Sequence, residues 1–158
     1  MVKCTFITLG ALKEDYLTRA VEEYKKRLSA FAEVQEINLK DERLVTESPA
    51  EVAEALEKEA DRLLEKIPDG AYTVALCVEG KALSSEEFAS LIENARDTSG
   101  KVCFIIGSSY GLSPRVKQRA NARISFSKMT FPHGLMRAIL LEQVYRGFTI
   151  LAGKKYHK

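Results

Sequence analysis

The chain has 158 residues and a formal net charge of +2, with 46% hydrophobic and 29% charged residues. This length fits a single folded domain, residues 1–158, and the composition is typical of a globular protein and excludes a disordered one. No apolar run approaches the roughly 20 residues that cross a bilayer, which excludes a membrane-spanning protein.

The pattern of apolar residues predicts a regular alternation of strands and helices. Short apolar runs indicate strands, and apolar residues spaced three and four apart indicate helices with one buried face. In chain order we expect a strand over residues 4–9, a helix over 17–31, a strand over 34–39, a helix over 49–67, a strand over 72–78, a helix between Ser84 and Gly100, a strand over 102–106, a short helix over 116–120, a strand over 124–126 and a helix over 135–148. Such alternation predicts an α/β fold, a mostly parallel sheet with helices on both faces.

Two helix starts are marked by capping residues. Ser48 precedes Pro49, whose dihedral suits a first helical turn, and Glu51 stands three residues after Ser48. Ser84 and Glu87 repeat this spacing. Both pairs predict a capping box, in which the serine hydroxyl and the glutamate carboxylate each accept a hydrogen bond from the other residue's backbone N–H.

The three cysteines, Cys4, Cys77 and Cys103, lie in predicted apolar strands, where a thiol behaves as a small hydrophobic group. No pair has the spacing of a metal or redox motif, so we expect reduced core cysteines. The N-terminus enters its first strand without the long apolar stretch and cleavage site of a secretory signal, which predicts a cytoplasmic protein.

A ligand site is expected at one edge of the predicted sheet. In open α/β sheets, ligands bind beyond the carboxyl ends of the strands, here in the loops after Leu76, Ile106 and Phe126. Gly80 follows the first of these positions, and Gly107 follows the second directly. Glycine lets the backbone approach a ligand closely, although the same glycines could simply turn the chain from strand to helix.

Several common active-site patterns are absent. There is no phosphate-binding P-loop sequence, and Gly10-Ala11-Leu12-Lys13 after the first strand is no dinucleotide-binding motif. His133 and His157 are the only histidines, so no metal site is predicted. No nucleophile elbow supports a serine hydrolase.

The charges are distributed unevenly. Residues 1–114 contain 14 basic and 21 acidic groups, a net charge of −7, whereas residues 115–158 contain 10 basic groups and one acidic group, a net charge of +9. Such asymmetry indicates a polyanionic partner, because Lys and Arg that neutralise phosphates supply most non-specific affinity for nucleic acids. The alternative is a lopsided solvated surface.

Residues 125–137 form a strand end, a hydroxyl-rich loop and the start of a helix, and are the densest cluster of functional residue types in the chain. Together with Glu142-Gln143-Val144-Tyr145-Arg146 and the terminal Tyr156-His157-Lys158, this segment resembles the ribosomal large-subunit methyltransferase H family of the SPOUT class. The resemblance extends over essentially the whole chain.

The resemblance implies a homodimer whose C-terminal half forms a deep trefoil knot, an exception to the rule that chains do not thread loops. It also implies that S-adenosylmethionine lies in the knot, held largely by backbone groups. The implied cofactor-binding residues are Leu76, Gly107, Phe126, Ser127, Lys128, Met129, Thr130 and Phe131. Two residues depart from the family. Many relatives have a second glycine in place of Ser108, and an acidic residue often stands in place of Cys77.

The same resemblance implies methylation of N3 of a pseudouridine in 23S rRNA, with the assembled ribosome as substrate. We expect Tyr156 and His157 of one subunit to complete the site of the partner, where they position the pseudouridine or assist loss of the N3 proton. The alternative is a purely structural role for both.

The sequence leaves the roles of other residues, and two other functions, open. His133 could act as acid or base or fix the loop at a helix start, and at least one of Arg137 and Arg146 is expected to face RNA or the partner subunit. Two rival functions are a knotted methyltransferase acting on another RNA, such as tRNA, and a non-catalytic ribosome-binding protein.

Overall fold

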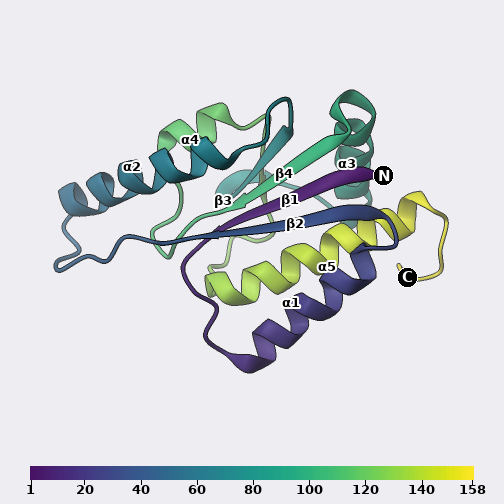
Figure 1. Ribbon diagram of the computed structural model, residues 1–158, viewed down its shortest axis with the longest axis horizontal. Coiled ribbons are helices and arrows are strands. Elements are labelled where there is room, and N and C mark those ends of the chain that lie inside the picture. Colours follow the sequence, from purple (N-terminus) through teal and green to yellow (C-terminus); the bar gives the residue numbers. More distant parts are fainter.

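A computed structural model describes residues 1–158 and contains one sheet of five parallel strands (Figure 1). Its strands are β1 (Val2–Leu9), β2 (Ala32–Leu39), β3 (Tyr72–Ala82), β4 (Lys101–Ile106) and β5 (Ala122–Ser125), in the order β2-β1-β4-β3-β5. β4 lies in the centre, which explains why its residues from Val102 to Ile106 are apolar without interruption. The predicted parallel sheet is confirmed.

Helices cover both faces of this sheet. They are α1 (Asp15–Leu28), α2 (Pro49–Lys66), α3 (Ser85–Ser99), α4 (Pro114–Arg119) and α5 (His133–Leu151). Figure 1 shows α2 and α4 on one side of the sheet and α1 and α5 on the other, and α3 shares its core with α1 and α5. Adjacent residues of a strand alternate between the two layers, so Phe104 packs with the α5 side and Ile105 with the α2 side. No helix combines the length and apolar character needed to span a membrane.

All ten predicted elements are present, and their ends differ by a few residues. α1 already ends at Leu28, so Phe31 lies outside the helix, where its ring stacks on Phe148 of α5 at 5.7 Å. This packing on the α5 side of the sheet explains why the apolar spacing continues to Phe31, beyond the end of the helix.

One of the two predicted capping boxes is complete. Ser84 accepts a hydrogen bond from Glu87 N (3.1 Å), and the Glu87 carboxylate accepts one from Ser84 N (2.8 Å). At α2 the prediction was half wrong. Ser48 does cap Glu51 N, but the Glu51 carboxylate accepts from Thr46 N (3.2 Å), because the preceding loop brings that N–H group within reach.

β3 interrupts its pairing with β5 to make a short excursion. Leu76 and Lys81 both pair with Ile124, so the four residues between them leave the ladder. Gly80 is required for the return, because a Cβ there would lie 2.6 Å from the Ile124 backbone carbon. The strand predicted to end at residue 78 therefore continues to Ala82, with an outward loop at residues 77–80.

Candidate functional site

A cavity of about 690 Å³ lies beyond the carboxyl ends of β3, β4 and β5, where the sheet predicts a ligand site. Three loops form its walls: the excursion at residues 77–80, the turn at residues 107–111 and the segment from Phe126 to Phe131. Seven of the eight predicted cofactor-binding residues line it, namely Leu76, Gly107, Phe126, Ser127, Met129, Thr130 and Phe131. Lys128 is exposed and does not line the cavity.

The turn at residues 107–111 depends on two glycines. A Cβ at Gly107 would collide with the carbonyl oxygen of Gly111, so only glycine fits there. Gly111 has φ +90° and donates a backbone hydrogen bond to Ser108 O (2.9 Å). This compact turn presents its backbone to the cavity directly after the central strand.

The excursion of β3 brings Cys77 and Glu79 into the cavity wall. Cys77 is half-buried, which corrects the expectation of a core cysteine, because the strand leaves the ladder at this residue. Burial raises the pKa of its thiol. Glu79 forms an ion pair with Lys117 of α4, and their hydrogen bond lowers the pKa of Glu79.

The third wall is shaped by Ser127. Its hydroxyl accepts a hydrogen bond from Met129 N (3.0 Å), and its carbonyl accepts one from the Ser125 hydroxyl (2.9 Å). Phe126 packs edge to face on Phe88 of α3 (5.8 Å). These contacts fix the backbone between β5 and α5, while Met129 remains largely exposed.

The chemistry of the cavity suits a ligand with flat and apolar parts held by backbone groups. Half of the 22 residues that line it are hydrophobic, among them Ile106, Leu112 and Met136. Its opposite charges, Glu79 and Lys117, neutralise each other. The volume falls in the usual range of about 300–1,000 Å³ for small-molecule sites. No group of three or more His, Cys, Asp or Glu side chains is placed to bind a metal ion.

His133 and Arg137 lie in the first turns of α5. His133 lines the cavity, where either of its predicted roles can apply. Arg137 is buried, with only 5% of its surface exposed, and donates hydrogen bonds to the carbonyls of Leu9 (3.1 Å) and Gly10. Arg137 therefore cannot contact RNA, because it ties α5 to the end of β1.

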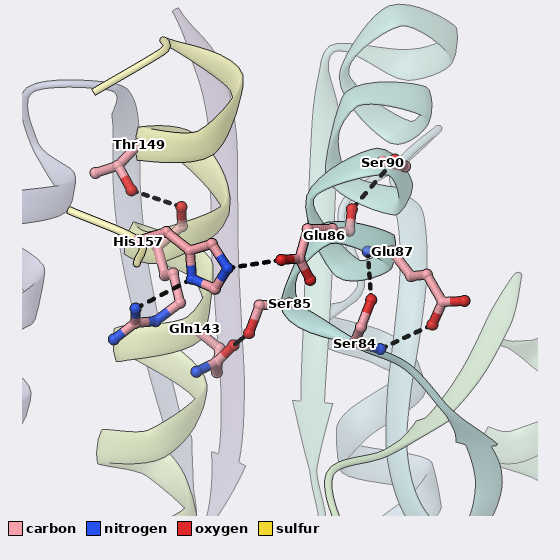
Figure 2. Close-up of polar contacts among 9 residues, drawn as sticks. Ser84, Ser85, Glu86, Glu87, Ser90, Gln143, Thr149 and His157 are labelled. Atoms are coloured by element: carbon pink, nitrogen blue, oxygen red, sulfur yellow. Dashed lines mark hydrogen bonds and ion pairs between the residues drawn. The ribbon is translucent and has the colours of Figure 1, made fainter. Parts of the chain in front are cut away.

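The predicted catalytic tail lies away from this cavity. The side chain of His157 packs between α5 and α3 (Figure 2), with Nε2 2.7 Å from Glu86 Oε1 and Nδ1 3.3 Å from Arg146 Nη1. Arg146 also pairs with Glu142 one turn earlier in α5 (2.5 Å). Since an arginine can only donate, His157 Nδ1 accepts in this arrangement, and Nε2 carries the proton toward Glu86.

Tyr156 lies on the same surface of α5. Its hydroxyl donates to Glu142 (3.2 Å), its ring meets Tyr145 edge to face (4.9 Å), and Arg146 lies 4.7 Å above the ring. Burial, followed by hydrogen bonding to Tyr24, raises the pKa of Tyr156 to about 12. Near neutral pH this hydroxyl therefore keeps its proton, so Tyr156 can donate a hydrogen bond but is no base.

Sequence reasoning missed part of the wall. Val78 and Glu79 were not predicted to line the site, because the excursion of β3 results from strand register. Lys117 of α4 was missed as well, and it joins the wall beside Glu79, with which it forms an ion pair. Met136 was missed for a different reason, since its side chain sits one turn into α5, beyond the loop. Gly80 was the one sequence signal that marked the excursion.

Comparison with known proteins defines the class. Residues 2–157 match the family model described as predicted SPOUT methyltransferase. The crystal structure of a probable methyltransferase from Bordetella pertussis Tohama I is similar, with a TM-score of 0.55, covering 92% of this chain and 96% of that chain. At 14% identity this likeness shows the fold alone. The protein is thus a SPOUT-type methyltransferase, and S-adenosylmethionine is its methyl donor.

Two relatives place it more closely. The ribosomal RNA large subunit methyltransferase H of Listeria monocytogenes serovar 1/2a is 49% identical over 96% of this chain and 97% of its own length. That of Bacillus thuringiensis (strain Al Hakam) is 52% identical over 98% of both chains. The chain therefore belongs to the ribosomal RNA large subunit methyltransferase H family.

Proposed function

We propose that this protein transfers a methyl group from S-adenosylmethionine to N3 of a pseudouridine in 23S rRNA. The cavity carries the proposal, because three loops at one end of the sheet bring seven of the predicted cofactor-binding residues together. The names of the relatives support ribosomal RNA as the substrate class. We further propose that residues 1–158 work as one domain, in the cytoplasm, on the assembled ribosome.

The walls of the cavity fit the methyl donor. Leu76, Ile106 and Phe126 offer apolar surface to the adenine ring, and the backbone of residues 107–111 and 127–131 offers hydrogen bonds. When bound, S-adenosylmethionine supplies an electrophilic methyl group on a sulfonium sulfur. The protein then has to orient the acceptor nitrogen, exclude water and accept the N3 proton.

The position of the tail supports action between subunits. Tyr156 and His157 pack on their own α5 and do not line their own cavity. In a symmetric dimer, the C-terminal end of one α5 can lie over the partner's cavity. We propose such a homodimer, with the C-terminal half of each subunit knotted. His157 is then the candidate acceptor of the N3 proton, at Nδ1 once its hydrogen bond from Arg146 is released. Tyr156 positions the base as a hydrogen-bond donor when its hydroxyl exchanges Glu142 for the base.

The cations available to RNA are fewer than the sequence indicated. Of the ten basic residues after position 114, Arg115, Lys117 and Arg146 form ion pairs with carboxylates, and Arg137 is buried. The other six are exposed and form no ion pair: Arg119, Arg123, Lys128, Lys154, Lys155 and Lys158. We propose that RNA phosphates contact members of this set, hereafter the free cations.

Methyl transfer from labelled S-adenosylmethionine tests the proposal. Intact ribosomes, separate subunits and naked 23S rRNA are offered as substrates, and the labelled nucleotide is mapped. We expect labelling of one pseudouridine, strongest in the assembled ribosome. Labelling of tRNA alone would assign a different substrate, and binding of S-adenosylmethionine without labelling of any RNA would refute the enzymatic proposal.

A further inference from the structure

A carboxyl group is buried beside the cavity, in a helix that does not line it. Glu59 of α2 has 2% of its surface exposed and forms no ion pair with a cation. Its Oε1 accepts a hydrogen bond from the Ser108 hydroxyl (2.9 Å), and its Oε2 accepts one from Glu42 N (2.9 Å). Because burial of a polar group is costly unless it is hydrogen-bonded, these two partners explain how Glu59 is tolerated there.

Ser108 is part of the cavity wall. It follows Gly107 in the tight turn, lines the cavity and is 8% exposed. Its hydroxyl points away from the cavity toward Glu59, so the side chain anchors the turn from behind. A second anchor lies two residues on, where the Tyr110 hydroxyl donates to Glu47 (2.8 Å).

Glu59 therefore connects three segments. Its own helix, α2, lies on the sheet face opposite α5. Glu42 and Glu47 belong to the loop between β2 and α2, and Ser108 and Tyr110 belong to the turn in the cavity wall. A shift of the turn would break a buried hydrogen bond, which fixes the backbone groups that face the cavity.

A neighbouring serine–glutamate pair lies outside the cavity wall. The Ser113 hydroxyl donates to Glu57 of α2 (2.6 Å), and Ser113 is 1% exposed. Ser113 does not line the cavity. Both serine–glutamate pairs join α2 to the same stretch of chain, but Glu57 is exposed and paired with Arg115, and Ser113 also caps α4 by accepting from Arg115 N. Ser113→Ala therefore serves as a control for the loss of a buried serine hydroxyl outside the cavity wall.

We propose that Glu59 is a positioning residue of the methyl-donor site, acting through Ser108 to hold the turn at residues 107–111 in its binding-competent form. The inference rests on the proposed placement of S-adenosylmethionine in this cavity. Glu59 itself does not touch the donor. It affects the affinity for the donor through the turn, and it has no part in the methyl-transfer step itself.

Calorimetric titration with S-adenosylmethionine, together with methylation kinetics at saturating donor, tests this role. We expect Glu59→Ala to raise the Kd for the donor about tenfold, the effect of one unmade buried hydrogen bond, while kcat stays within about twofold. Glu59→Gln should restore near-normal affinity, because its carbonyl can accept from Glu42 N and its amide can donate to the Ser108 hydroxyl.

Ser108→Ala and Ser113→Ala complete the design. Ser108→Ala removes the same hydrogen bond by a smaller change and should weaken donor binding. It keeps the test possible if Glu59→Ala does not fold. Its effect and that of Glu59→Ala should not add, since both act through one contact. Ser113→Ala should lower the free energy of unfolding while leaving the Kd within about twofold.

The outcomes separate the two claims. Normal donor affinity in both Ser108→Ala and Glu59→Ala would overturn the positioning role, as would an equal loss of affinity in Ser113→Ala. The proposed donor site would instead be refuted if the unaltered protein failed to bind S-adenosylmethionine. It would also be refuted if binding left the cavity residue Cys77 as open to thiol labelling as before.

Discussion

His157 Nε2 lies 2.7 Å from Glu86 Oε1, and both residues belong to the same chain, on the surface between α5 and α3. This hydrogen bond lowers the pKa of the Glu86 carboxyl, which is otherwise exposed. The contact holds the tail in a defined place outside its own cavity. A tail that is positioned rather than free is suited to complete a site on a neighbouring subunit.

Deletion of residues 156–158 should abolish methylation of ribosomes without changing the affinity for S-adenosylmethionine. The reason is that Tyr156 and His157 do not line the donor cavity of their own chain. Calorimetry and methyl transfer measure the two effects on one preparation. Normal methylation by the truncated protein would contradict the role of the tail.

Mixing of subunits tests whether the tail acts on the partner. A dimer that combines one tail-deleted subunit with one Gly107→Ala subunit keeps a single site with both an intact cavity and an intact tail. At a donor concentration too low to fill the Gly107→Ala cavity, random exchange of the two variants should therefore restore about a quarter of the normal activity. A mixture that stays inactive after verified exchange would place the tail on its own subunit.

Gly107→Ala should weaken binding of the methyl donor and cost about 2 kcal/mol of stability, because the added Cβ collides with the Gly111 carbonyl and displaces the turn. Gly70→Ala is the matched control. Gly70 has φ +73° and open space around it, so the substitution costs about 1 kcal/mol of backbone strain far from the cavity. Denaturant unfolding and calorimetry should show that only Gly107→Ala affects the donor.

Much of the fold could be predicted because each strand and helix has a local signal. The apolar run at residues 102–106 and the capping box at Ser84 and Glu87 encode their elements directly, and the structure confirms both. The positions of buried charges carry no such signal. The charged side chains of Arg137 and Glu59 predict exposure, whereas their spacing, four residues before the buried Leu141 and Leu63, predicts burial. Only the packing of α5 on β1 and of α2 against the cavity turn, which supplies their hydrogen bonds, decides between the two.

The candidate site was predictable to a different degree in each wall. The loop at residues 126–131 is rich in functional residue types, and Gly107 follows the central strand, so both could be found from the sequence. The excursion at residues 77–80 depends on where β3 rejoins β5 across a distance of more than forty residues. The contact between the tail and Glu86 is longer still in sequence and depends on the packing of α3 beside α5.

The cysteines should differ in reactivity. Burial raises the pKa of Cys4 and Cys103 to about 12. Cys77 is only half-buried, in the cavity wall, and this partial burial also raises the pKa of its thiol. Since the thiolate is the reactive form, iodoacetamide should label only Cys77 in the folded protein, slowly at pH 8 and faster as the pH rises.

S-adenosylmethionine should protect Cys77 from this labelling by occupying the cavity. Mass spectrometry of digested protein identifies the labelled thiol. The protein unfolded in denaturant, in which all three cysteines react, gives the reference rate. Equal labelling with and without the methyl donor would place the donor elsewhere.

Among the free cations, Lys154 and Lys155 directly precede Tyr156 in the sequence, so their charges should help to dock the tail region on RNA. The double substitution to Gln should weaken binding to ribosomes and reduce the slope of log K against log salt by about 2, roughly one for each lost phosphate contact. Affinity for S-adenosylmethionine should stay the same, since neither lysine lines the cavity.

Lys66→Gln is the control for this charge effect, because Lys66 is exposed at the end of α2 and forms no ion pair. It changes the net charge by one without altering the C-terminal set, so it should leave the salt slope unchanged. Binding is measured between about 50 and 200 mM salt, where phosphate contacts dominate the change in affinity. A slope that falls in Lys66→Gln by about half as much as in the double variant, in proportion to the charge removed, would show that net charge, and not the position of these lysines, governs the encounter with the ribosome.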